Sequence, residues 1–300
     1  MSIPAPRILS LALALAASCA AGGGRRHAPL APHPQVVRTA VIGGMTMTGL
    51  WDEVAARFEA RTGLRVRVVA TGPRPRLARA FRAGHADLLT MHSGDVTTDL
   101  VADGIGVRMR PWTRNDLVVV GPPSDPAGIA GLRDGAEAFR RIAAAEAPFV
   151  DFLGIGSREL CHRTWQRAGV EPKGPWVLQD RTEDKHDILL FARQRDAYVV
   201  VGRMPVLFGK MPRGRMRILV EGDPAMRRPY VVMEANPRRF PEANHAGARA
   251  LSDFLLSEPL QRFLATFGAE RYGGIPLFHP VWPWAEGDGD AAGAGGLDEE

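Results

Sequence analysis

The sequence predicts an α/β fold built mostly on parallel strands, and three observations support this prediction. Strand-like apolar runs alternate with helix-like runs between residues 36 and 90, the order typical of parallel sheets. Glycines such as Gly63 and Gly84 follow the helix-like runs, where helices commonly end. The chain has 300 residues, of which 45% are hydrophobic, so it can bury one large core or two of ordinary size.

The elements follow one another in a clear order. Leu50, Val54 and Phe58 recur at helical spacing on one face, whereas residues 64–69 alternate as a half-buried strand does. The first part of the chain predicts strands at 36–42, 64–69 and 86–90, with helices at 49–61 and 76–83. The second part predicts strands at 115–121, 197–201, 217–220 and 230–234, with helices at 135–145, 157–168, 245–256 and 259–267.

Charge and composition exclude several classes of function. The 38 basic and 33 acidic residues leave a net charge of +5, and the basic residues are scattered without the interleaved aromatic residues of a single-strand binder. We therefore expect no nucleic-acid partner, while a mildly basic surface suits a small anion. Two cysteines are too few for a disulfide framework or an iron–sulfur cluster. The histidines show no metal-ligand spacing, so we expect no metal and no cofactor.

The catalytic motifs of several common enzyme classes are absent. The sequence contains no G-x-S-x-G, no phosphate-binding P-loop and no H-E-x-x-H. Gly154 and Gly156 open a helix-like run, but Glu159 stands where a dinucleotide-binding fingerprint has its third glycine. Ser157 and His162 do not share a helix face. We therefore expect that this protein is not an enzyme.

The N-terminus predicts export. Arg7 precedes an apolar run at 8–17, so residues 1–21 are expected to be a signal peptide. Two alternatives remain for its end: lipidation at Cys19, which lies in a lipobox-like stretch, or ordinary cleavage after Ala20 or Ala21. We expect a flexible tether at 22–34, a disordered acidic tail at 285–300, and a location in the periplasm, either free or anchored by a lipid.

Two helix starts follow a strand and a small-residue turn. Gly43 and Gly44 precede Thr48 in the first, and Gly156 precedes Ser157 in the second. Thr48 and Ser157 are each expected to be an N-cap. Free backbone N–H groups make a helix start suitable for an anion, although a plain capped helix explains either site alone. Together they suggest an anion held between two lobes.

A resemblance covers about residues 36–282. The segments that carry it are 84–89 with His92, 114–122, 124–129, 136–142, 147–150, 165–170, 220–224, 229–230, 235–237, and 267–268 with 272–278. In these segments the chain resembles the tungstate-binding periplasmic solute-binding proteins of bacterial ABC importers.

The resemblance implies a two-lobed periplasmic-binding-protein fold of type II, in which each lobe is a mostly parallel sheet flanked by helices. Residues 35–114 and 229–284 would form lobe one, and 115–228 lobe two, with 115–121 and 230–234 as the crossing strands. A monomer would close by hinge bending over tungstate or molybdate and deliver it to an ABC permease. The alternative is a periplasmic sensor or accessory interaction protein with the same fold.

The ligand motifs depart from those of the family. Gly43, Gly44 and Met45 replace a hydroxyl-rich run of which only Thr48 keeps a hydroxyl, and Arg74 follows Gly72 in a changed turn. The loop at 151–158 keeps Gly156 and Ser157 in the family's place but loses its arginine. The candidate ligand-binding residues are Gly43, Gly44, Met45, Thr48, Gly72, Arg74, Gly156, Ser157, Arg158 and Arg203.

Four large apolar side chains are expected near the cleft. They are Met45, Met47, Trp51 and Phe152. They would suit a less polar ligand, or they pack in the core.

Overall fold

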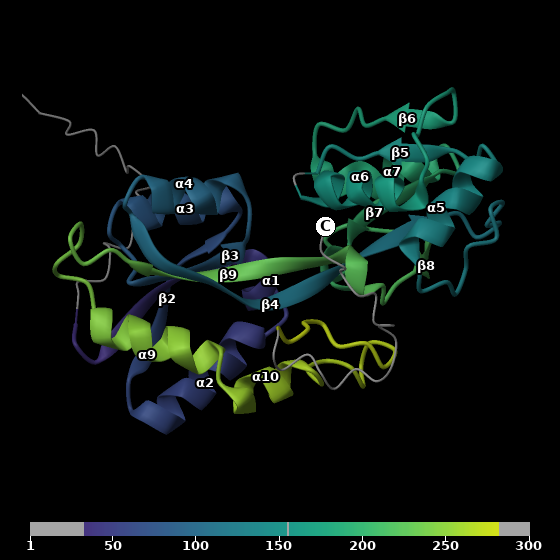
Figure 1. The fold of residues 1–300 in the computed structure, drawn as a ribbon. Helices are drawn as coiled ribbons and strands as arrows, with labels where there is room; N and C mark the ends of the chain where they lie inside the picture. The colour runs from purple at the N-terminus through teal and green to yellow at the C-terminus, as the bar shows by residue number, and fades with distance from the viewer. Residues whose placement is uncertain (1–32, 155, 282–300) are drawn as a thin grey trace, which may run out of the picture.

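The computed structural model describes residues 33–154 and 156–281, which form two lobes side by side (Figure 1). The expected signal peptide at 1–21 with Cys19, the tether up to residue 32 and the acidic tail at 285–300 lie outside the described residues. Within the described ranges, no helix has both the length and the apolar character that crossing a bilayer requires.

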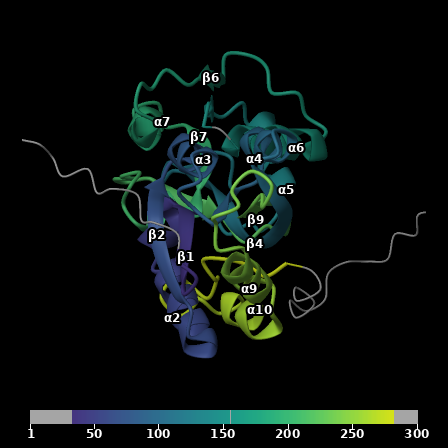
Figure 2. The same cartoon turned by 90° about the vertical axis from the view of Figure 1, so that its left-hand side faces the viewer.

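Lobe one is a sheet between two layers of helices. Its strands are β1 (Val36–Ile42), β2 (Arg65–Gly72), β3 (Leu88–His92), β9 (Arg227–Ala235) and the first part of β4 (Gly106–Gly121). Its helices are α1 (Gly43–Met47), α2 (Leu50–Thr62), α3 (Arg74–Arg82), α4 (Asp95–Ala102), α9 (His245–Leu255) and α10 (Glu258–Leu264). Helices α3 and α4 cover one face of the sheet, and α2, α9 and α10 cover the other (Figures 1 and 2). Six of the seven residues of β1 are buried, as expected for a strand covered on both faces.

Lobe two is built in the same way on a smaller sheet. It contains β5 (Phe149–Asp151), β6 (Val177–Gln179), β7 (Tyr198–Gly202) and β8 (Arg217–Val220), with helices α5 (Gly135–Ala144), α6 (Ser157–Ala168), α7 (Ile188–Arg193) and α8 (Arg203–Leu207). Two single 3₁₀ turns, η1 (Lys185–Asp187) and η2 (Pro224–Met226), complete the described elements. Alternate residues of β7 join different cores: Tyr198 and Val200 pack with α5 and α6, and Val199 and Val201 with α7.

Strands β4 and β9 connect the lobes. The strand order is β2-β1-β3-β9-β4-β7-β5-β6, with β8 also paired to β4. Residues up to Asp116 of β4 pair with β9, and those from Leu117 pair with β7. Because the two strands run in opposite directions, each carries the chain once between the lobes (Figure 1).

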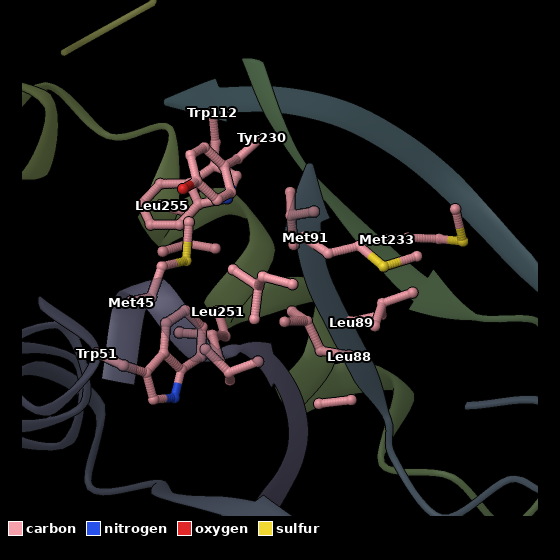
Figure 3. Packing of buried hydrophobic residues seen from close by; sticks show 14 of the residues in the cluster. Met45, Trp51, Leu88, Leu89, Met91, Trp112, Tyr230, Met233, Leu251 and Leu255 are labelled. Carbon is pink, nitrogen blue, oxygen red and sulfur yellow. The ribbon is translucent and has the colours of Figure 1, made fainter. Parts of the chain in front are cut away.

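The core of lobe one is rich in aromatic residues and methionines close to the crossing strands. Trp51 and Trp112 meet edge to face with ring centroids 6.4 Å apart, a favourable arrangement for two aromatic rings. Tyr230 of β9 joins the same cluster, together with Met45 (Figure 3). The crossing is therefore packed firmly onto lobe one.

The expected α/β fold with two lobes is confirmed, but the sheets are more mixed than expected. Strands β1, β2, β3 and β5, β6, β7 are parallel within their groups, whereas β9 is antiparallel to β3 and β4, and β4 to β7. Helices α1, α4, α7 and α8 and strand β6 were not expected; all are short, from three to eight residues. Strand β4 begins at Gly106 instead of at 115, because a bulged first half pairs with β9.

Candidate functional site

A cavity of about 620 Å³ lies between the lobes, beside the crossing strands. Lobe one contributes the end of β1, the turn from β2 into α3 and the end of β3. Lobe two contributes the loop after β5, the first residue of α6, and α8. A second hollow of about 780 Å³ lies next to it and shares Arg228 with it.

Glycines bring two strand ends of lobe one together at the cavity. A side chain at Gly43 would begin 3.5 Å from the Cα atom of Gly72. Gly72 itself has a φ of +128°, a backbone conformation that favours glycine strongly. The half-buried backbone of Gly43 and Gly72 thus lines the cavity.

Two arginines from different elements approach the cavity. Arg74 is the first residue of α3, and Arg228 is the second residue of β9. Burial lowers the pKa of Arg74, while Asp95 opposes this change. Burial and the charge of Arg74 lower the pKa of Arg228 to about 10. The two guanidinium groups are therefore close enough to repel each other, and a bound anion would relieve that repulsion.

The guanidinium group of Arg228 lies against the backbone of Gly156. A Cβ atom added at Gly156 would overlap the guanidinium group of Arg228, and Gly156 has a φ of +86°. Within the described ranges, Arg228 forms no salt bridge, and its attraction to Glu159 is weaker than the effect of burial. Its charge is thus available to a ligand.

His92 and Tyr230 both line the cavity. They lie opposite each other on β3 and β9, and their rings stack with centroids 4.1 Å apart. Burial, together with the charges of Arg228 and Arg74, holds the pKa of His92 well below 6.5. Burial raises the pKa of Tyr230. At neutral pH, His92 is therefore uncharged and Tyr230 keeps its O–H as a hydrogen-bond donor.

Two buried polar atoms at the cavity lack a partner among the described residues. They are the hydroxyl of Tyr230 and the side-chain oxygen of Asn115. Asn115 lies opposite Arg228 in the pairing of β4 with β9. Buried polar groups without a hydrogen bond are costly and uncommon. The Tyr230 hydroxyl can donate a hydrogen bond into the cavity, whereas the Asn115 oxygen can only accept one.

The structure brings together six of the ten candidate residues. Gly43, Gly44, Gly72, Arg74 and Ser157 line the cavity, and Gly156 supports Arg228. The other four face elsewhere. Met45 is fully buried in the core of lobe one. Of the apolar residues expected near the cleft, Met47 and Phe152 line the cavity, whereas Trp51 is in the core.

The expected N-caps are wrong at both helix starts. The N-cap of α2 is Gly49, and that of α6 is Gly156; both have positive φ angles. Thr48 instead ends α1, and its hydroxyl donates to the carbonyl oxygen of Gly44 at 2.9 Å. Glycine adopts these left-handed conformations more readily than serine or threonine does, so the chain turns one residue away from the expected cap.

Arg203 and Arg158 are engaged away from the cavity. The Arg203 side chain is 3% exposed and donates to Glu221 at 2.8 Å and to the carbonyl oxygen of Tyr272 at 2.7 Å. These contacts attach the C-terminal segment to lobe two. Arg158 pairs with Asp151 at 3.0 Å on the surface of lobe two.

Sequence reasoning did not name Arg228, Tyr230 or Asn115 as site residues. Extending the expected strand at 230–234 back by two residues could have found the first two, because Arg228 and Tyr230 then share one face. His92 was noted only as part of the resemblance. Nothing in the sequence pairs Asn115 with Arg228, since they lie 113 positions apart.

Other chemistry has little support in the described ranges. No group of three or more histidine, cysteine, aspartate or glutamate residues there could hold a metal. Cys161 is buried in the core of lobe two, and burial raises the pKa of its thiol. A buried thiol of this kind is unreactive.

Comparison with known proteins agrees with this fold. Residues 39–270 match the family described as "Bacterial extracellular solute-binding protein". The tungstate-binding protein TupA of Peptoclostridium acidaminophilum is 30% identical over 286 residues, which cover 91% of this chain and 95% of that protein. The tungstate-binding protein TupA of Desulfovibrio alaskensis has a similar structure, with a TM-score of 0.66, 26% identity and coverage of 82% and 98% of the two chains.

A second solved structure, described as the tungstate ABC transporter from Geobacter sulfurreducens, has a TM-score of 0.62 and 27% identity, over 78% of this chain and 99% of that one. The family and these relatives are substrate-binding proteins, not enzymes. From the match over 39–270, this chain belongs to the bacterial extracellular solute-binding proteins.

Proposed function

We propose that this protein is the exported, substrate-binding component of an ABC importer, and that it binds a small anion in the cavity between its lobes. The observation that carries the proposal is the pair of arginines, Arg74 and Arg228, at an interlobe cavity with no acidic residue among its described lining. The names of the relatives support tungstate or molybdate as members of the ligand class.

The binding mechanism follows from the position of each group. Arg74 belongs to lobe one, whereas Ser157 begins α6 in lobe two. An anion that touched both would draw the lobes together, since hydrogen bonds to a charged group are each worth about 1.5–3 kcal/mol. Rigid-body closure would bend the crossing strands near Asp116 and Arg227, where their pairing passes from one lobe to the other.

The proposal also covers the two moving lobes, the place where the protein acts and its partner. Residues 35–114 with 229–284 would move as one lobe and 115–228 as the other. The chain would act in the periplasm as a monomer, with Cys19 as the lipid attachment point if the protein is anchored. It would deliver its ligand to an ABC permease.

Titration calorimetry tests the proposal. The mature chain is titrated with tungstate, molybdate, sulfate and phosphate at low salt. We expect binding of at least one of these anions, and Arg228→Gln should weaken it about 10- to 100-fold, the equivalent of one charged hydrogen bond. Arg158→Gln is the matched control, because that arginine lies outside the cavity lining. Equal affinities in the parent and Arg228→Gln proteins would contradict the proposal.

A further inference from the structure

Lys185, His186 and Lys210 line the interlobe cavity besides Arg74, Arg228 and the buried polar groups already described, and most of the remaining side chains are apolar. Seven large apolar side chains line it: Ile42, Met47, Leu117, Phe152, Leu153, Met204 and Met211. Only Ser157 and Tyr230 add hydroxyl groups from the described lining. A bare dianion needs hydrogen-bond donors on every side, because each charged oxygen left without one carries a large desolvation cost. The apolar part of this lining suits such an ion poorly.

The cavity is also large for a tetrahedral oxyanion. Its volume is about 620 Å³, within the range of roughly 300–1,000 Å³ that holds organic ligands of drug size. A tetrahedral oxyanion has four oxygens, and a water molecule takes up about 30 Å³ in the liquid. In the arrangement of the lobes seen here, the anion would fill only a small part of this space, and the rest adjoins apolar side chains.

Leu153 gives independent support. Its side chain lines the cavity and is 40% exposed, one of five large apolar side chains exposed to this degree in the described ranges. Its backbone is held in place, since the Leu153 N–H donates to Asp180 at 3.1 Å. Asp180 in turn accepts from Lys185 at 2.8 Å. A firmly placed, exposed leucine at a cavity wall is explained by an apolar ligand that covers it.

We infer that the preferred ligand is an organic anion, with a compact acidic head group at Arg74 and Arg228 and an apolar body against Leu153, Phe152 and the methionines. The inference rests on the proposed function and narrows its substrate class. Methionine side chains adapt to varied apolar shapes, so several bodies of about the size of an aromatic ring should fit.

A series of sulfonates tests the inference by calorimetry on the mature chain. The probes are sulfate, methanesulfonate, butanesulfonate and benzenesulfonate, with tungstate as the inorganic reference. We expect affinity to rise about fourfold for each added methylene group up to butanesulfonate. Benzenesulfonate should bind at least tenfold more tightly than methanesulfonate and more tightly than tungstate.

Two variants distinguish the contribution of the apolar lining to affinity from that of the two arginines. Leu153→Asn should weaken benzenesulfonate binding at least threefold and leave methanesulfonate unchanged. Leu190→Asn is the control, because Leu190 is 39% exposed on α7 and is not part of the cavity lining. Thermal unfolding of both variants verifies that they fold.

The outcomes are distinguishable. Affinities that are flat along the series, or tungstate binding that exceeds every sulfonate, would overturn the organic ligand and leave the proposed anion binding intact. Equal effects of Leu153→Asn on methanesulfonate and benzenesulfonate would also overturn it. If no anion in either set binds to the folded chain, the proposed function fails and the inference fails with it.

Discussion

Gly156 sets the position of the Arg228 guanidinium group. Any side chain at residue 156 would occupy the same space, and the φ of +86° at this residue also favours glycine. The arginine that carries the binding proposal thus depends on the glycine that caps α6. A glycine cannot cap a helix through a side-chain hydrogen bond, as serine or aspartate can. The space taken by Arg228 and the positive φ angle explain why a glycine nevertheless stands before α6.

The variant Gly156→Ala should therefore weaken anion binding by about tenfold or more, because Arg228 has to move. Part of its effect on stability will come from the strained φ alone. Gly131→Ala is the matched control: Gly131 has a φ of +82°, but no atom lies within 4 Å of the added Cβ. Calorimetry of both variants with the same anion measures the difference. Equal affinities in the two variants would show that Gly156 does not position Arg228.

The lowered pKa of His92 should make the free energy of unfolding depend on pH. Its pKa is held well below 6.5 in the folded chain, first by burial and then by the charges of Arg228 and Arg74. The unfolded chain therefore binds this proton more readily, and the free energy of unfolding should fall as pH drops below 6.5. The slope from this one group is at most about 1.4 kcal/mol per pH unit.

Urea unfolding of His92→Phe measures this contribution. Phenylalanine keeps an aromatic ring beside Tyr230 but cannot be protonated, so the variant should lose stability less steeply between pH 6.5 and 5. His162→Gln is the control, since the His162 side chain is 51% exposed. A slope in His92→Phe as steep as in the parent protein would contradict the assignment of this pH dependence to His92.

At the scale of elements, Asp87 joins three segments of lobe one. Its carboxylate accepts from the backbone N–H of Arg38 at 2.8 Å, from the Arg38 guanidinium group, and from the backbone N–H of Asn244 at 3.1 Å. Both members of the Arg38–Asp87 pair are buried. Strand β1, the residue before β3 and the residue before α9 are thereby held together.

Asp87→Ala should destabilise the protein by about 3–5 kcal/mol, because it leaves a buried arginine charge without its partner. Asp103→Ala removes an exposed pair with Arg82, in which the aspartate side chain is 52% exposed, and should cost less than about 1 kcal/mol. The urea midpoints of the two variants give the comparison. A loss in Asp87→Ala no larger than in Asp103→Ala would argue against this role.

Sequence reasoning predicted the long elements well and the short ones poorly. Helix α6 has 12 residues, with buried positions at helical spacing and a glycine at each end, and strand β7, although only five residues long, is a continuous apolar run that ends in a glycine. Helices α1 and α8 have five residues each, too few to show a period, and α1 consists of the Gly43–Met47 stretch that resembles a turn. The site was harder to predict, because Arg228, Asn115 and Gly156 meet only after strand pairing and lobe packing are complete.

At the scale of the whole molecule, binding and closure should be coupled. The lobes are connected by β4 and β9, and Arg203 ties the segment after α10 to lobe two through the carbonyl oxygens of Tyr272, Ile275 and Pro276. A ligand bound to both lobes favours the closed arrangement only through contacts that the open one lacks.

We expect the radius of gyration, measured by small-angle X-ray scattering, to fall when a binding anion is added. It should stay constant in Arg228→Gln at the same anion concentration, whereas equal compaction in both proteins would contradict the coupling.

The central claim is that an anion binds between the lobes at Arg74 and Arg228. The most direct measurement is a crystal structure of the mature chain with tungstate, in which the anomalous signal of tungsten marks the position of the anion. The account predicts a peak in the interlobe cavity within hydrogen-bond reach of both guanidinium groups and of the Tyr230 hydroxyl. If calorimetry shows that tungstate binds, an empty cavity at a saturating tungstate concentration, or a peak only at the outer surface, would contradict it.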